Sequence, residues 1–182
     1  MQSLETRLAG LILLAPEVHG DQRGFLVETY VAVRHAAAGV NVEFVQDNHS
    51  RSRRGTLRGL HFQTEPGQAK LVRVATGRIL DVVVDIRRSS PTFGEHETFE
   101  LDDVAHHQLF IPIGFAHGFC VLSDTADVVY KVSSRYDPAT EAGIAWDDPA
   151  LGIDWRTDAP IVSERDRSNR TLAEIADRLP AW

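Results

Sequence analysis

The sequence predicts an all-β protein, a jelly-roll-like barrel with short flanking helices that lie mainly at its C-terminal end. Most residues between 43 and 132 fall into short runs of alternating or β-branched residues, separated by turn signals such as Ser90-Pro91 and Ser123-Asp124. The helical spacing that a parallel α/β sheet needs is absent from these runs. No linker, repeat or low-complexity tract interrupts the 182 residues, so we expect one domain over 1–182.

In chain order, residues 11–30 predict a strand, a turn at 19–22 and a second strand from Phe25. Residues 31–38 predict a short helix closed by Gly39. Thr171 and Glu174 form a capping-box pattern that predicts a short helix near the C-terminus. Between these helices, strands are expected at 43–46, 56–63, 70–75, 78–86, 97–101, 108–112, 115–122 and 126–132.

Composition excludes several classes of function. The formal net charge of -7 argues against a nucleic-acid-binding surface. The apolar run at 11–14 is too short to span a membrane and no signal peptide is recognisable, so we expect a cytoplasmic protein without a membrane partner. The single Cys120 lies in an apolar run, which favours a small buried residue over a catalytic thiol.

Residues suited to acid–base chemistry lie on the predicted strands. His61, His117 and Tyr130 each fall within one, and inward-pointing residues of a small barrel converge on one cavity. A histidine is a natural base near neutral pH, a tyrosine can return a proton, and the Lys70 ammonium can stabilise an enolate oxygen. A solvated edge strand whose charges discourage aggregation is the structural alternative for the stretch around His61.

A metal site is a rival interpretation, because jelly-roll barrels often bind metal through histidine clusters. His61 has no histidine or carboxylate two residues further on, and the only adjacent pair is His106-His107 in a predicted turn. This spacing favours chemistry without a metal.

Arginines beside glycines suggest an anionic ligand. Arg23 and Arg58 both precede a glycine, where backbone and ligand can approach closely. Guanidinium groups match phosphate oxygens, and aromatic residues such as Phe25 and Tyr136 could stack on a base. The combination suits a nucleotide-linked substrate.

Long motifs throughout the chain resemble the dTDP-4-dehydrorhamnose 3,5-epimerase family, the cupin-fold epimerases of dTDP-sugars. The resemblance covers nearly the whole chain in order. It is carried by Asp21-Gln22-Arg23-Gly24-Phe25, Leu57-Arg58-Gly59-Leu60-His61-Phe62-Gln63, Pro112-Ile113-Gly114-Phe115-Ala116-His117-Gly118-Phe119, Trp146-Asp147-Asp148-Pro149 and Ser163-Glu164-Arg165-Asp166, with shorter matches between them.

The resemblance implies a catalytic set and a reaction. His61 would remove a proton next to the ketone of a dTDP-linked 4-keto-6-deoxyhexose, with Asp166 orienting the imidazole. Tyr130 would return a proton on the opposite face, and Lys70 would stabilise the enolate. C3 and C5 would both be inverted, giving dTDP-4-dehydro-L-rhamnose. The family needs no metal or organic cofactor.

The resemblance also implies the residues that hold the substrate and the partner chain. His117, backed by Asp81, would line the sugar pocket, and Tyr136 would stack on thymine. The family is typically a homodimer whose N-terminal segment carries Arg23 and Phe25 across to the partner's site. The nucleotide and diphosphate would be held by Arg23, Glu28, Gln46, Asn48, Arg58, Glu141 and Arg165.

Some positions depart from simple expectation. Arg58 and His61 have opposite parity on an ideal strand, so both can face the cavity only if Gly59 allows a bulge or bend. Arg165 stands where the family often has Lys, and Arg156 follows Trp155 where a Pro is common, so the C-terminal loop can run differently.

Three alternatives stay open. They are a single-centre epimerase acting at C3 or C5, a 3,4-ketoisomerase of the same sugar pathways, and a non-catalytic or metal-binding cupin.

Overall fold

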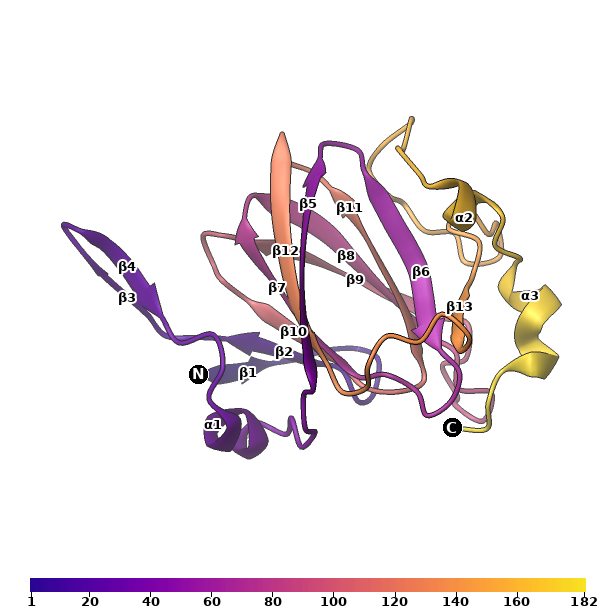
Figure 1. Ribbon diagram of the computed structural model, residues 1–182, viewed down its shortest axis with the longest axis horizontal. Coiled ribbons are helices and arrows are strands. Elements are labelled where there is room, and N and C mark those ends of the chain that lie inside the picture. The colour runs from indigo at the N-terminus through magenta and orange to yellow at the C-terminus, as the bar shows by residue number, and fades with distance from the viewer.

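Two antiparallel sheets pack face to face in the structure, a computed structural model that describes residues 1–182 (Figure 1). The larger sheet has the order β1 (Gln2–Leu4), β2 (Ile12–Ala15), β10 (Gln108–Ile111), β7 (Lys70–Thr76), β12 (Thr125–Val132) and β5 (Gln46–Arg53). The smaller has the order β13 (Glu141–Gly143), β6 (Leu57–Gln63), β11 (Phe115–Val121), β8 (Arg78–Asp85) and β9 (His96–Asp102). The all-β, jelly-roll-like prediction is confirmed.

Three apolar layers hold the sheets in place. The central layer lies between them and includes Val72, Val83 and Phe119. A second layer covers the outer face of the five-stranded sheet, where Trp155 and Leu172 from the C-terminal segment pack. A third, smaller layer lies on the outer face of the six-stranded sheet. Alternating residues of each sheet therefore face different layers, as in other two-layer β folds.

The short helices flank the barrel as expected. Helix α1 (Ala32–Ala37) lies where the sequence predicts it, and α3 (Leu172–Ile175) begins at the Thr171–Glu174 capping box. The turn η1 (Ala176–Arg178) follows α3 directly. Helix α2 (Glu164–Arg167), which precedes α3, was not expected. None of these helices is long and apolar enough to cross a membrane.

Most predicted strands are present, but two predictions were wrong. The strand expected at 43–46 begins at Gln46 instead and runs to Arg53. The sequence pattern missed most of it because its inward residues are polar, so apolar and polar residues do not alternate. The turn expected at 19–22 lies between β3 (Val18–Asp21) and β4 (Gly24–Val27), where Asp21 accepts a hydrogen bond from the backbone of Arg23. Strands β1 and β13 were not expected.

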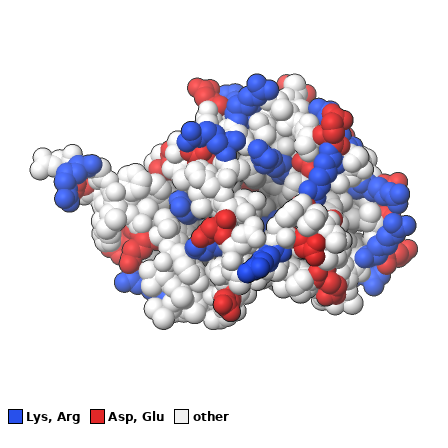
Figure 2. Space-filling view, viewed as in Figure 1, with Lys and Arg blue, Asp and Glu red and all other residues white.

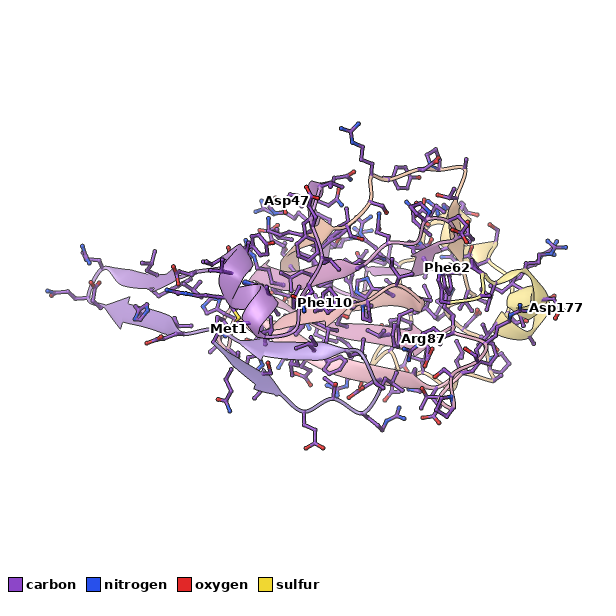
Figure 3. All side chains as sticks on the ribbon, turned by 90° about the horizontal axis from the view of Figure 1, so that it is seen from below. Met1, Asp47, Phe62, Arg87, Phe110 and Asp177 are labelled. Atoms are coloured by element: carbon purple, nitrogen blue, oxygen red, sulfur yellow. The ribbon has the colours of Figure 1, made fainter.

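The hairpin formed by β3 and β4 projects from one end of the molecule, opposite the C-terminal helices. Two perpendicular views agree on this (Figures 1 and 3), and the space-filling view shows the same projection (Figure 2). Phe25 and Leu26 on the hairpin are mostly exposed, 60% and 68% respectively. An exposed apolar pair on a projecting hairpin is typical of a surface that another chain covers.

Gly59 disturbs strand β6 as the sequence predicts. The pairing of β6 with β11 shifts register between His117 and Phe119, so two residues of β6 lie opposite one residue of β11. Gly59 has φ +146, and a Cβ at this position would lie 2.5 Å from Gly118 Cα. The bulge changes the parity of the strand, and Arg58 and His61 consequently line the same cavity.

Candidate active site

A cavity of about 570 Å³ opens between the two sheets. Strands β5 and β12 of the larger sheet and β6 and β11 of the smaller one contribute its walls, and residues 161–166 close one side. A neighbouring cavity of about 310 Å³ shares five lining residues with it, so the two form one cleft. Asp81 lies behind His117, outside the lining. The lining itself brings together eleven of the residues singled out in the sequence: Gln46, Asn48, Arg58, His61, Lys70, His117, Tyr130, Tyr136, Glu141, Arg165 and Asp166.

His61 and Asp166 form a close pair. His61 Nε2 lies 2.6 Å from Asp166 Oδ1, and the buried carboxylate also accepts a hydrogen bond from the Gly59 backbone at 3.4 Å. Burial alone would raise the pKa of Asp166, but its contacts with His61, Gly59 and Ser163 outweigh burial and lower the pKa. Since an ionised carboxylate only accepts, His61 Nε2 donates, and Nδ1 is left as the basic nitrogen.

Helix α2 positions Asp166. Ser163 is its N-cap and accepts a hydrogen bond from the Asp166 backbone N–H at 3.1 Å. A residue at this position of a capped first turn has little freedom to move. The carboxylate is therefore fixed by the C-terminal segment, while the imidazole is fixed by the barrel.

Lys70 lies in the cleft with little access to solvent, its residue being 8% exposed. Its Nζ donates to the backbone oxygen of His61 at 3.3 Å. Burial lowers the pKa of Lys70 to about 8, against the opposing charges of Asp81 and Glu141. At neutral pH the group is still mainly an ammonium, and it is poorly neutralised by its surroundings.

His117 and Asp81 form a second buried pair on neighbouring strands β11 and β8. His117 Nε2 lies 2.9 Å from Asp81 Oδ2, while Asp81 Oδ1 has no hydrogen-bond partner. Burial lowers the pKa of His117, and together with the nearby charges of Lys70 and His61 it outweighs the opposing effect of Asp81. His117 is thus a neutral hydrogen-bonding group at neutral pH.

Tyr130 enters the cleft from the six-stranded sheet, whereas His61 enters from the five-stranded sheet. Burial raises the pKa of the Tyr130 phenol, and the positive charge of Arg58 only partly opposes this. The phenol therefore keeps its proton near neutral pH. The phenol and the imidazole thus stand on different walls of one cleft.

The rim of the cleft carries an aromatic ring and an ion pair. Glu141 Oε2 lies 2.7 Å from Arg165 Nη1. The side-chain contact with Glu141 raises the pKa of the exposed Tyr136. The Tyr136 backbone N–H donates to Gln46 Oε1 at 3.1 Å, and Gln46 Nε2 donates to Asn48 Oδ1 at 2.9 Å. An exposed ring beside amide groups can stack on a planar base and bind its edge.

Three of the predicted binding residues lie away from this cleft. Arg23, on the projecting hairpin, has an 88% exposed side chain that pairs with Asp21. The Phe25 ring lies tilted against His106 with ring centroids 4.5 Å apart, and Glu28 pairs with Arg34. A single chain does not bring these three residues to the cavity.

The sequence interpretation missed several lining residues. Ser50 and Phe119 line the main cavity, as do Thr56 and Ile161. Ser50 could have been found from the uncharged polar residues at 46, 48, 50 and 52, which alternate with ionisable ones and therefore share one face of β5. Cys120 is buried outside this lining, and burial raises the pKa of its thiol.

The residues do not group as metal ligands. Nowhere do three or more histidine, cysteine, aspartate or glutamate side chains come together in a way that could hold a metal ion. The two histidines of the cleft are each engaged by one aspartate instead.

Comparisons with known proteins agree on one family. The sequence model of the family described as dTDP-4-dehydrorhamnose 3,5-epimerase matches residues 5–174. A dTDP-4-dehydrorhamnose 3,5-epimerase of Pseudomonas aeruginosa is 50% identical over 179 residues, covering 96% of this chain and 98% of the relative. A dTDP-4-dehydrorhamnose 3-epimerase of Streptomyces niveus is 44% identical over 172 residues, covering 93% and 83%.

A solved structure is similar over the whole chain. It is the dTDP-6-deoxy-D-glucose-3,5-epimerase of Legionella pneumophila in complex with dTDP-4-keto-L-rhamnose, with a TM-score of 0.96 and 42% identity, covering 100% of this chain and 98% of that one. This likeness agrees with the cupin-type jelly roll expected from the sequence.

Proposed function

The chain belongs to the dTDP-4-dehydrorhamnose 3,5-epimerase family, and on this premise we propose how its cleft epimerises dTDP-4-dehydro-6-deoxy-D-glucose at C3 and C5. The protein is an isomerase. The reaction removes and returns protons on the carbons next to the 4-keto group and needs a base, an oxyanion stabiliser and an acid. The observation that carries the proposal is the His61–Asp166 pair at 2.6 Å, in one cleft with Lys70 and Tyr130.

His61 Nδ1 takes the proton from the carbon. Asp166 holds the imidazole in the tautomer that leaves Nδ1 free, and its negative charge stabilises the imidazolium that forms. The electron pair of the broken C–H bond moves into an enolate, whose oxygen lies against the Lys70 ammonium. Because Lys70 is poorly neutralised in the cleft, its charge acts strongly on a developing oxyanion.

Tyr130 returns a proton to the same carbon from the other wall, which inverts the centre. Its raised pKa keeps the phenol protonated and ready to donate. The first round leaves a proton on His61 and removes one from Tyr130, so exchange with solvent takes the proton from His61 and reprotonates Tyr130 before a second round inverts the other carbon. His117, held neutral beside Asp81, serves as a hydrogen-bonding group for the sugar.

The substrate's nucleotide lies along the rim. Tyr136 stacks on the thymine, with Gln46 and Asn48 at the base edge, and Arg58 and Arg165 meet the diphosphate. Glu141 fixes Arg165 in place.

The active form is a homodimer in which the projecting hairpin completes the partner's site. Exposure of Arg23 and Phe25 in the single chain supports this arrangement, because neither has any role in its own cleft. Glu28 at the base of the hairpin would travel with them. We place the protein in the cytoplasm, with one domain over residues 1–182.

Proton NMR of the keto sugar nucleotide incubated with the protein in D2O tests the proposal. Deuterium at both C3 and C5, with a rhamnose-type product after reduction, is the expected outcome. Deuterium at one carbon only, with that centre alone inverted, would assign a single-centre activity, which at C3 is the one named for the Streptomyces niveus relative. Absence of exchange at both carbons would overturn the enzymatic assignment for this substrate.

A further inference from the structure

Arg58 lines the main cavity but has no carboxylate within 4.0 Å, unlike Arg165, which is paired with Glu141. Its one side-chain hydrogen bond runs from Nε to the Ser52 Oγ atom, over 3.1 Å. A long, exposed arginine side chain without further contacts can adopt many rotamers. The Ser52 hydroxyl is therefore the group that limits where the guanidinium lies.

Ser52 is well placed to act as a fixed point. The residue is 6% exposed and lies on β5, directly opposite Ala126 of β12, which is fully buried. Its side chain has one rotatable bond before the oxygen, and its backbone belongs to the β5–β12 ladder. The Ser52 oxygen accordingly has little conformational freedom. The Arg58 guanidinium would have much more without this hydrogen bond.

The hydrogen bond also leaves the right atoms free. It engages Nε alone, so both terminal Nη groups of Arg58 remain available to a ligand in the cavity that this residue lines. These two groups form one edge of the guanidinium, which matches two phosphate oxygens at once.

We propose that Ser52 is a positioning residue, whose hydroxyl holds the Arg58 guanidinium with its Nη edge toward the diphosphate of the bound nucleotide. This inference rests on the proposed function, in which Arg58 meets the diphosphate. Ser52 itself is not among the residues that line the cavity, so it acts through Arg58. The charge of Arg58 also reaches Tyr130, whose pKa it lowers against the effect of burial, so displacement of Arg58 is felt at the acid as well.

A double-mutant cycle with two ligands tests this inference. Ser52→Ala, Arg58→Ala and the double variant are titrated calorimetrically with dTDP and with thymidine, which lacks the diphosphate. We expect Ser52→Ala to weaken dTDP binding about five-fold and to leave thymidine binding unchanged. In the Arg58→Ala background, Ser52→Ala should weaken dTDP binding no further.

Other results would overturn the inference in distinguishable ways. Equal weakening of dTDP binding in both backgrounds would make Ser52 independent of Arg58, and equal weakening for dTDP and thymidine would make its effect a general one on the fold. Wild-type dTDP affinity in Ser52→Ala, with Arg58→Ala impaired, would overturn the role of Ser52 alone. Wild-type affinity in Arg58→Ala would remove the diphosphate role of Arg58 and the inference with it, while binding of dTDP to the wild type would still stand.

Discussion

Raising the pH from 7 to 9 should lower turnover strongly, because Lys70 loses its positive charge over this interval. Its pKa of about 8 means that about nine-tenths of the side chain is an ammonium at pH 7 and about one-tenth at pH 9. If the cation stabilises the enolate, kcat should fall about nine-fold over this interval. Tyr130, with its raised pKa, and His117, with its lowered pKa, do not titrate in this window.

Stability should change in the opposite direction over the same range. The unfolded chain holds its Lys70 proton up to about pH 10.5, so between pH 8 and 10.5 the unfolded state binds more protons and the free energy of unfolding rises with pH. The difference between the two Lys70 pKa values corresponds to about 3 kcal/mol in the free energy of unfolding. This stabilisation is present at high pH and is lost as the pH falls through about 8.

Steady-state kinetics and urea unfolding at matched pH values measure both effects. Lys70→Arg is the control, because a guanidinium stays charged throughout and its residual activity should show no fall near pH 8. Lys70→Met should lose turnover at every pH and gain about 1–3 kcal/mol of stability at pH 7. A kcat that stays level in the wild type up to pH 9.5 would refute the assigned charge and role of Lys70.

Three further predictions address other parts of the site. Gly59→Ala should lower the free energy of unfolding by about 2–4 kcal/mol in urea melts, since its Cβ would lie 2.5 Å from Gly118 Cα; an unchanged midpoint would show that β6 and β11 can separate freely. Asp166→Asn should reduce kcat about 100-fold or more with little change in dTDP affinity, and a variant impaired only in binding would contradict its role as partner of the base. Arg23→Ala chains mixed with Tyr130→Phe chains should recover part of the lost activity if each hairpin serves the partner's site, and failure of recovery in confirmed mixed dimers would argue against the exchange.

The sequence predicts the barrel well where its strands pack against apolar layers on both sides. Strand β8, buried from Ile79 to Asp85, is apolar apart from Asp81 and Asp85, which is close to the pattern expected of such a strand. Strand β5 escaped prediction for the opposite reason. One of its faces lines the cleft with Gln46, Asn48 and Ser50, so no apolar alternation marks it.

The candidate site was predictable to the extent that motif residues fall on strands. The bulge at Gly59 could be anticipated from the parity of Arg58 and His61. The distances between site residues could not be predicted. Asp166 and His61 are 105 positions apart in the sequence, and the capped helical turn that brings them together is defined only by the fold. The proposed place of Arg23 in a partner's site depends on a second chain, which no pattern within one sequence can place.

The pairing of His61 with Asp166 joins two parts of the chain that have different structural duties. The imidazole belongs to a strand inside the sandwich, whereas the carboxylate is carried by residues 161–170, which attach to the barrel through isolated bridges at Thr56 and Ile144 and through apolar packing. Substitutions in this outer segment can therefore move the carboxylate relative to the imidazole without rebuilding the sheets. Related chains can accordingly differ in how closely the two groups meet while keeping the same sandwich.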